Sequence, residues 1–340
     1  MHLTKIEQFK KLHDWHYLNC DEYRNLSRNI FKTGDMDVLE KLPYVPVELF
    51  KSLDLKSVPA AEVSKVMHSS GTTGQQRSKI NLTTENSSLQ KKVLVKIVSD
   101  VLGSARVPIL ILDIEGQIKN PNLFTARSAG ILGFLIFGTK RFFALTDDYK
   151  VDLDAVEKFV GAHTDKPQKL VYGFTSIIWE EILEKLSFGD CIFGNQHCIL
   201  IHGGGWKKLE SRNISSADFK NTVHSKLGPN VKVVEYYGMV EQTGSIYMGC
   251  EHGYLHTNGY NEIIVRNPQT LQPNTFGEIG VIQTLSTIAW SYPGYSILTE
   301  DIGVIHGVND CKCGQSGTYF EVKGRLPKAE LRGCSNTYAR

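Results

Sequence analysis

A short segment, residues 68–79, has the sequence HSSGTTGQQRSK and gathers hydroxyl side chains, two glycines and a final lysine. Glycines let the backbone curl so that its N–H groups converge on an anion. The Ser and Thr hydroxyls add donors, and Lys79 adds a point charge suited to phosphate oxygens. No Gly-Lys-Ser/Thr follows, which disfavours a P-loop NTPase. The segment indicates a phosphate-binding loop, although a plain Ser/Gly surface turn has the same composition.

Cysteines and histidines form a second group with possible chemistry. Cys250 is followed by His252 and His256, and the pair Cys311 and Cys313 lies much further along the chain. Two thiolates one residue apart, with a cysteine and a histidine from a distant loop, can complete a tetrahedral Zn²⁺ shell. The spacing matches none of the standard zinc-finger patterns. The alternative is a set of reduced structural cysteines with surface histidines.

Composition excludes several classes of protein. The 38 basic and 36 acidic residues leave a formal net charge of +2, which gives no electrostatic case for nucleic acid or an anionic membrane. No apolar run approaches the ~20 residues that cross a bilayer, and the polar N-terminus lacks a signal-peptide stretch. We therefore expect a cytoplasmic protein whose seven cysteines are mostly reduced.

The chain of 340 residues exceeds the length at which one core stops growing, so more than one subdomain is expected. Residues 107–114 (VPILILDI) are typical of a strand covered on both faces. We expect similar strands at 141–145, 169–174, 198–202 and 231–236, and helices at 85–102 and 177–186. Strands that alternate with helices predict an α/β fold with a mainly parallel sheet.

The two ends of the chain differ from this pattern. Residues 1–60 are polar and helical in character, and beyond Tyr247 the pattern becomes β-rich. The strands expected in that later part are 262–265, 277–285 and 319–322. The predicted division is a helical N-terminal segment at 1–60, an α/β core at 61–246, a β-rich subdomain at 247–324, and a hinge and short tail at 325–340.

Five segments together carry a family resemblance. The string SSGTTG followed by a lysine resembles the signature loop of the adenylate-forming superfamily of acyl-CoA synthetases. Residues 202–207 (HGGGWK) resemble the glycine segment that lines its adenine pocket, and 235–241 (EYYGMVE) resemble its aromatic-Gly-x-Thr-Glu element. Residues 298–301 (LTED) resemble its ribose-binding segment, and 324–325 resemble its Gly-Arg hinge. Each match alone is weak, but the five follow in the family order.

The resemblance implies a role for each matching residue. Tyr237 would lie against adenine, Glu241 would hold Mg²⁺ beside ATP, and Asp301 would bond the ribose hydroxyls with help from Arg325. Val240 stands where the family usually has Thr. The other residues implied to bind the nucleotide are Ser69, Ser70, Gly71, Thr72, Thr73, Gly74, Gly203, Gly204, Gly205 and Gly238.

The resemblance also implies the fold and a metal site. The expected fold is the N-terminal domain of adenylate-forming enzymes, with α/β subdomains, a smaller β-rich subdomain and no C-terminal lid, since the sequence ends fifteen residues after Arg325. Relatives of phenylacetate-CoA ligase carry a Cys…Leu-His and Cys-x-Cys-Gly pair at these positions. That match favours a closed, structural Zn²⁺ site made by Cys250, His256, Cys311 and Cys313.

The end of the chain, with Cys334 in the string RGCS, narrows the resemblance to the acyl-protein synthetase of the bacterial luminescence fatty-acid reductase type. That family makes acyl-AMP from a fatty acid and loads the acyl group on a cysteine near its own C-terminus. Catalytic roles are thereby implied for Lys79, Glu241 and Cys334. Without a lid lysine, the positive charge falls to Lys79, Arg325, Lys328 or a partner's residue.

Two other functions stay open at this point. A lidless aryl- or acyl-CoA ligase would make Cys334 dispensable and release acyl-CoA. A nucleotide- or acyl-binding partner without catalysis would retain the loop but give no turnover. The acid, fatty or aryl, is expected near residues 172–176, and an acyl-accepting reductase or carrier is the expected protein partner.

Overall fold

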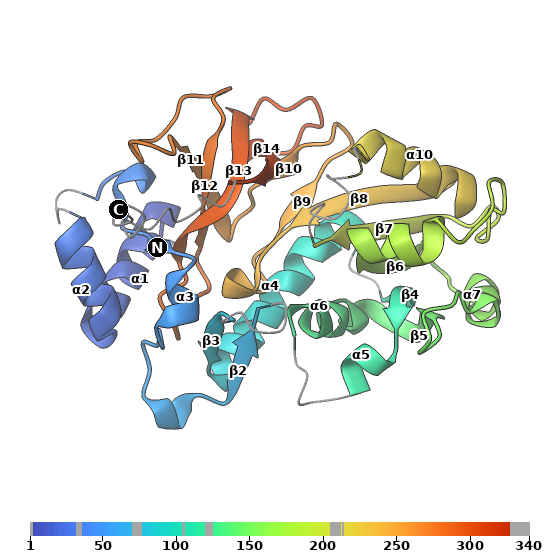
Figure 1. The fold of residues 1–340 in the computed structure, drawn as a ribbon, viewed down its shortest axis with the longest axis horizontal. Helices are drawn as coiled ribbons and strands as arrows, with labels where there is room; N and C mark the ends of the chain where they lie inside the picture. The colour runs from blue at the N-terminus through green and yellow to red at the C-terminus, as the bar shows by residue number, and fades with distance from the viewer. Residues whose placement is uncertain are drawn as a thin grey trace, which may run out of the picture.

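The fold is built on one long sheet, shown in Figure 1. The computed structural model describes residues 3–31, 36–69, 77–103, 106–119, 125–204, 212 and 214–326. Within these residues the sheet has twelve strands, in the order β11-β12-β13-β14-β10-β9-β8-β7-β6-β4-β5 with β1 beside β13. A separate two-stranded sheet joins β2 and β3.

One half of the long sheet is parallel. It consists of β4 (Val107–Ile114), β5 (Gly138–Leu145), β6 (Lys169–Phe174), β7 (Cys198–Gly203) and β8 (Val231–Tyr237). Every residue of β4 is buried, as expected of a β-branched run covered on both faces. The predicted strands at 107–114 and 169–174 have the observed bounds, and the other three fall inside observed strands. The prediction of a mainly parallel α/β sheet is confirmed for this half.

Helices cover both faces of the parallel strands (Figure 1). Helices α4 (Thr84–Leu102) and α6 (Ala126–Phe134) pack on the face that contains Ile109 and Ile111. Helices α7 (Leu153–Val160) and α10 (Ser216–Lys226) pack on the face that contains Leu110 and Leu112. Successive side chains of a strand point to opposite faces, which explains this alternation. Among the described helices, none is long and apolar enough to cross a membrane.

One sequence prediction on this half needs refinement. The stretch 177–186 was predicted as a helix, but it contains the end of α8 (Thr175–Ile177) and then a π-helix, Ile178–Leu183. Residues 129–138 lie in α6, the 3-10 turn Leu135–Phe137 and the first residue of β5. The remaining short helices are α5 (Gly116–Lys119), Leu39–Lys41, Ala60–Glu62 and Val240–Gln242.

The other half of the long sheet is antiparallel, as the β-rich pattern beyond Tyr247 predicts. Its strands are β9 (Tyr247–Gly249), β10 (Leu255–His256), β11 (Asn261–Arg266), β12 (Gly280–Ser286), β13 (Ser296–Val308) and β14 (Thr318–Arg325). The predicted strand at 277–285 was wrong at its start, because Gly277 has a φ of 87° and the strand begins only at Gly280. The longest strand, β13, was not predicted.

The N-terminal part, for which the sequence predicts helical character over 1–60, begins with two helices and continues into a short strand and a short helix. Helices α1 (Lys5–Asn19) and α2 (Asp21–Ile30) are followed by β1 (Val45–Pro46) and α3 (Leu49–Ser52). Strand β1 pairs in parallel with β13. Phe9 and Tyr23 share a core with Leu285 and Ile297 of the antiparallel strands. In Figure 1 the blue helices accordingly lie beside the orange strands. The predicted four-part division of the chain stays a prediction.

A buried polar side chain fixes the connection between β12 and β13. The amide oxygen of Asn86 on α4 accepts hydrogen bonds from the backbone N–H groups of Trp290 and Ser291, at 3.2 and 2.9 Å. Its amide nitrogen donates to the Ile288 carbonyl at 2.9 Å. Asn86 is fully buried, so these bonds replace the water contacts that it loses.

A buried ion pair joins β4 to α6. The Asp113 carboxylate is fully buried and accepts from Arg127 Nε at 2.7 Å and from Arg127 Nη2 at 2.5 Å. The Arg127 side chain is 24% exposed. A bidentate guanidinium is the geometry that best compensates a carboxylate removed from water.

We expect Arg127→Met to lower the free energy of unfolding by about 3 kcal/mol, because it leaves the buried Asp113 carboxylate without its guanidinium. Urea denaturation measures this loss. Lys119→Met is the matched control, since it breaks the exposed pair with Glu115 at 2.6 Å, and such exposed pairs contribute little to stability. Equal losses in the two variants would contradict a special role of the buried pair.

Candidate functional site

The predicted phosphate loop is closed by a small antiparallel hairpin. Strands β2 (Lys65–His68) and β3 (Lys79–Leu82) pair so that His68 lies opposite Lys79. Ser69 N donates to the Ser78 carbonyl at 3.3 Å, and Ser78 N donates to Ser69 Oγ at 2.9 Å. These bonds bring the two ends of the loop together. The predicted loop residues between them, Ser70, Gly71, Thr72, Thr73 and Gly74, lie outside the described residues.

Glu241 lies beside the end of this loop. It belongs to the turn Val240–Gln242, is 5% exposed, and its carboxyl group neighbours the side chain of Ser78. Tyr292 Oη donates to the Glu241 carbonyl at 2.7 Å and holds the turn in place. Burial raises the pKa of the Glu241 carboxyl, and the Ser78 hydroxyl with the charges of Lys51 and Arg325 acts in the opposite direction. The structure therefore joins Glu241 to the loop end.

The glycine segment at the end of β7 is shaped by aromatic rings. A Cβ on Gly203 would lie 2.6 Å from Tyr236 Cε1, and a Cβ on Gly204 would lie 2.4 Å from Phe174 Cδ1. Gly204 also has a φ of 89°, a conformation that other residues rarely adopt. Glycine is thus required at both positions for steric reasons, whatever they bind. The third predicted glycine, Gly205, lies outside the described residues.

Three predicted nucleotide-binding residues meet at one carboxylate. Tyr237 Oη, at the end of β8, donates to Asp301 Oδ2 at 2.7 Å. Arg325 Nε donates to Asp301 Oδ1 at 3.0 Å across the β13–β14 pairing. Burial raises the pKa of the Tyr237 phenol, so it stays protonated and donates. Gly238, the next predicted residue, packs closely on Ile246, since an added Cβ would lie 2.9 Å from Ile246 Cγ2.

Two further acidic groups, which sequence reasoning did not single out, lie next to this carboxylate. Glu300 accepts from Arg325 Nη1 at 3.3 Å. Its carboxyl also shares a hydrogen bond with the carboxyl of Glu48, and this contact raises the pKa of Glu300. Glu48 in turn pairs with Lys51 Nζ at 2.8 Å. No sequence signal could have found these contacts, because Glu48 and Glu300 are brought together only by the pairing of β1 with β13.

The predicted metal ligands come together at the turns between antiparallel strands. One ligand atom from each of Cys250, His256, Cys311 and Cys313 lies within 4.8 Å of the others. Cys250 follows β9, His256 lies on β10, and the other two cysteines precede β14. Within the cluster, His256 Nε2 lies 3.4 Å from Cys313 Sγ. Three thiols and an imidazole at this spacing could hold a tetrahedral metal ion.

The geometry also separates the two candidate histidines. His256 is 4% exposed and turned into the cluster, where burial lowers the pKa of its imidazole and favours the neutral form. The side chain of His252 is 39% exposed, and its nearest charged neighbour is Glu251 at 3.8 Å. His252 is therefore not part of the cluster. Gly314, which has a φ of 76°, lets its N–H reach back to the Cys311 carbonyl at 3.0 Å and closes the second turn.

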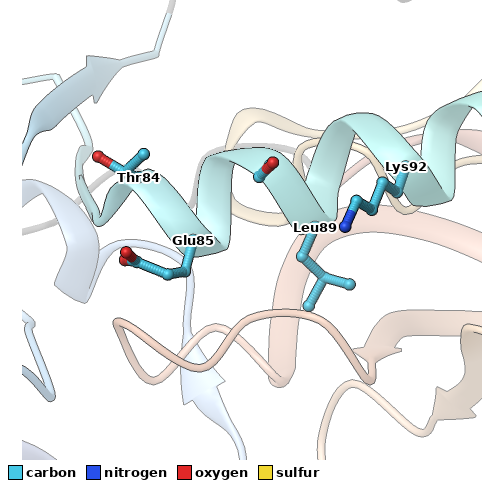
Figure 2. A pocket seen from close by; sticks show the side chains of 5 residues that line it. Thr84, Glu85, Leu89 and Lys92 are labelled. Carbon is cyan, nitrogen blue, oxygen red and sulfur yellow. The ribbon is translucent and has the colours of Figure 1, made fainter.

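A surface hollow of about 320 Å³ lies along α4. Figure 2 shows that its side chains follow one another along this single helix. The residues are Thr84, Glu85, Ser88, Leu89 and Lys92. None of them was predicted as a site residue, and none belongs to the contacts around Asp301 and Glu241. The hollow is therefore distinct from the candidate site.

The side chains of the described site can bind different parts of one ligand. The carboxylate of Asp301, oriented by a phenol and a guanidinium, has further lone pairs that can accept a diol. Glu241 offers a carboxylate to a divalent cation, and Lys79 stands at the loop end for phosphate oxygens. Together with the loop, these groups suit a nucleoside polyphosphate.

Comparison with known proteins defines the class first. The structure is similar to 2-hydroxyisobutyryl-CoA ligase in an open conformation in complex with 2-HIB-AMP and CoA. The TM-score is 0.68 at 14% identity, over 94% of this chain and 74% of that one. This likeness shows the fold, which is the N-terminal-domain fold of adenylate-forming ligases. The prediction of fold class is confirmed.

The family follows from the sequence match. The family model described as acyl-protein synthetase, LuxE, matches residues 3–340. The chain belongs to this family and is an enzyme of the ligase class. The long-chain-fatty-acid–luciferin-component ligase of Aliivibrio fischeri is 23% identical in an alignment of 346 positions, which covers 96% of this chain and 85% of that protein. The same ligase of Vibrio harveyi is 22% identical in an alignment of 350 positions, with the same coverage. The predicted family resemblance is confirmed.

We expect Glu241→Gln to stabilise the protein at neutral and alkaline pH. Because burial raises the folded-state pKa of Glu241 above its ordinary value of 4.5, its ionisation opposes folding as the pH rises through the folded-state pKa. Below the unfolded-state pKa both states are protonated and the penalty is absent. The free energy of unfolding of the variant should therefore exceed that of the wild type at about pH 8 and equal it at about pH 4.

Urea denaturation across this pH range measures the difference. Glu157→Gln is the control, because Glu157 is exposed on α7 and its charge should leave the pH profile unchanged. A Glu241→Gln profile parallel to that of the wild type would show that the carboxyl carries no burial penalty.

Proposed function

We propose that the chain activates a long-chain fatty acid with ATP as acyl-AMP and then transfers the acyl group to its own Cys334 as a thioester. One observation carries the nucleotide part of the proposal. Asp301 and Arg325 are bonded to each other, and the Arg325 charge also acts on the carboxyl of Glu241. Three residues from separate segments, each implied to contact ATP, thus lie in one site.

In the first step a carboxylate oxygen of the acid attacks the α-phosphorus of ATP. The bond between the α-phosphorus and the oxygen that bridges to the β-phosphorus breaks, and pyrophosphate leaves. The new bond between the carboxylate oxygen and the α-phosphorus completes acyl-AMP. Negative charge grows on the phosphate oxygens during this step, so preorganised donors of the loop and the Lys79 ammonium stabilise it. Asp301 holds the ribose, with its orientation fixed by Tyr237 and Arg325.

A magnesium ion is part of this proposal. Glu241 is the residue that would hold it, because its carboxyl is buried beside the loop end and offers the oxygen ligand that Mg²⁺ prefers. When bound, the ion neutralises charge on the phosphate oxygens. Tyr292 keeps the Glu241 turn in position through its hydrogen bond to the Glu241 carbonyl.

In the second step the thiolate of Cys334 attacks the acyl carbon. The carbon–sulfur bond forms, the bond between the acyl carbon and the phosphate oxygen of AMP breaks, and AMP leaves with that electron pair. The thiol proton is released to solvent beforehand, since only the thiolate is the nucleophile. Cys334 lies outside the described residues, so its role rests on the family and on the sequence motif.

The names of the relatives support the choice of substrate. Both relatives are ligases of long-chain fatty acids and a luciferin component, which supports a long-chain fatty acid here. An acyl-accepting reductase or carrier protein and a cytoplasmic location stay predictions. The CoA-ligase alternative has the fold of solved neighbours in its favour, but the fold is common to both activities.

We expect intact mass spectrometry to detect an acyl adduct after incubation of the protein with ATP, Mg²⁺ and a long-chain fatty acid. Neutral hydroxylamine should remove the adduct, because it cleaves thioesters. Cys334→Ala should abolish the adduct and retain the acid-dependent exchange of labelled pyrophosphate into ATP. Cys191→Ser, which alters a half-buried thiol elsewhere, should retain both.

Other outcomes decide between the alternatives. Release of acyl-CoA without a protein adduct would favour the CoA ligase. Absence of pyrophosphate exchange with every acid tested would favour a binding protein without catalysis. An adduct that persists in Cys334→Ala would show that another group accepts the acyl chain.

Zinc is the metal that best suits the cluster of Cys250, His256, Cys311 and Cys313. A set of three thiolates and one imidazole is a common ligand set of structural zinc sites, and four protein ligands leave no open position for catalysis. The cluster joins the turn after β9 to the turn before β14. We therefore assign it a structural role.

We expect metal analysis by inductively coupled plasma mass spectrometry to find about one zinc ion per chain. Cys313→Ser should lose most of this zinc and lower the thermal unfolding temperature, because it removes a ligand. Cys191→Ser is again the control and should keep the zinc. A wild-type protein without zinc, or a Cys313→Ser variant with full zinc, would contradict the assignment.

A further inference from the structure

Helix α3 brings a lysine to the nucleotide site from the N-terminal part of the chain. Strand β1 pairs with β13, and Val47 N donates to the Leu298 carbonyl at 2.9 Å. The chain therefore enters α3 beside the strand segment that carries Glu300 and Asp301. Lys51 lies on α3, only a few residues after this pairing.

A second anchor fixes α3 relative to Glu241. Phe50, the residue before Lys51, is fully buried and packs edge-on against the ring of Tyr292, with centroids 6.2 Å apart. Tyr292 in turn donates to the Glu241 carbonyl at 2.7 Å. Tyr292 thus contacts both Phe50, the neighbour of Lys51, and the turn that carries Glu241. This contact restricts how far the two can separate.

The charge of Lys51 acts on the carboxyl groups of the site. Its ammonium pairs with Glu48 at 2.8 Å, and the Glu48 carboxyl shares a hydrogen bond with that of Glu300. Lys51 also lowers the pKa of Glu241, against the effect of burial. The Lys51 side chain is 31% exposed, so it is not locked inside the core.

Arg325 and Lys51 are held differently. Arg325 bonds both Asp301 and Glu300 through its planar guanidinium, which fixes its direction. Lys51 has a flexible four-carbon stem and a partly exposed pair with Glu48, and such pairs contribute little to stability. Lys51 can therefore leave Glu48 at small cost. Arg325 is also partly exposed, but it would have to break its contacts with both Asp301 and Glu300 to move away.

We infer that Lys51 is a phosphate-binding cation of the adenylation site, which exchanges the Glu48 carboxylate for the triphosphate of ATP. This inference rests on the proposed function, because it assigns the phosphates of ATP to this site. A lysine beside the acidic side chains of Glu48, Glu300 and Asp301 offsets part of their repulsion of the incoming polyphosphate. A lysine that turns toward the phosphates also stabilises the charge on the leaving pyrophosphate.

The first test measures acid-dependent exchange of labelled pyrophosphate into ATP. Lys51→Met should lower kcat/KM for ATP about 10- to 100-fold, the range of one lost charge-assisted hydrogen bond, and leave the KM for the fatty acid unchanged. Lys51→Arg should retain most of the activity. Lys56→Met is the matched control, since Lys56 pairs with Asp54 at 2.5 Å and is 34% exposed. Wild-type kinetics in Lys51→Met would overturn the inference.

A double variant separates phosphate binding from local charge balance. If Lys51 only compensates the acidic pair, Lys51→Met combined with Glu48→Gln should regain the wild-type KM for ATP, which would overturn the inference. If Lys51 contacts the phosphates, the double variant should stay as impaired as Lys51→Met.

A binding measurement keeps the inference testable without turnover. We expect MgATP to raise the unfolding temperature of Lys51→Met less than that of the wild type, while adenosine, which has no phosphate, raises both equally. An equal loss with adenosine would indicate a general structural defect and overturn the inference. If MgATP stabilises the wild-type protein fully but the protein shows no pyrophosphate exchange, the proposed function is rejected. The comparison of MgATP with adenosine in Lys51→Met then still decides whether Lys51 binds the phosphates.

Discussion

The site depends on one buried side chain, the amide of Asn86 on α4. It bonds the backbone at Ile288, Trp290 and Ser291 and so fixes the connection from β12 to β13. That connection carries Tyr292, whose hydroxyl holds the carbonyl of Glu241. Because Asn86 is fully buried, each of these bonds replaces a lost contact with water, and an unpaired member would be costly. The position of Glu241 is thus set by a helix of the parallel half of the molecule.

The antiparallel and N-terminal parts then complete the site around Glu241. β13 and β14 supply Asp301 and Arg325, and the pairing of β1 with β13 brings Glu48 into contact with Glu300. Each contact joins segments that are distant in the sequence but adjacent in the sheet. The shared core of α1, α2 and the antiparallel strands provides the apolar burial that keeps these segments together. The polar groups of the site are therefore positioned by a hydrophobic contact that lies outside it.

The sequence predicted the parallel half of the fold well because its strands are covered on both faces. Such strands are continuous apolar runs, so 107–114 and 169–174 were found with their exact bounds. β13 was missed because glycines and charged residues interrupt its alternation, and its pairing contains two register shifts. Asp301 and Arg325 were found from short motifs. Lys51 was not, because a lysine on a four-residue helix has no motif, and only the pairing of β1 with β13 gives it a neighbour in the site.

The cysteine–histidine cluster and the nucleotide site are connected through β14. The turn with Cys311 and Cys313 lies just before β14. Arg325 is the last residue of this strand and pairs with Asp301 on β13. Two register shifts between β13 and β14 lie between these ends, and a slip of one residue would turn Arg325 to the other face of the sheet. His256 pairs with Tyr319 at the start of β14, and the four ligand atoms of the cluster lie within 4.8 Å of one another. With zinc bound as proposed, the cluster would constrain the end of the strand where its register begins. That constraint would support the contact between Arg325 and Asp301 at the other end of the strand.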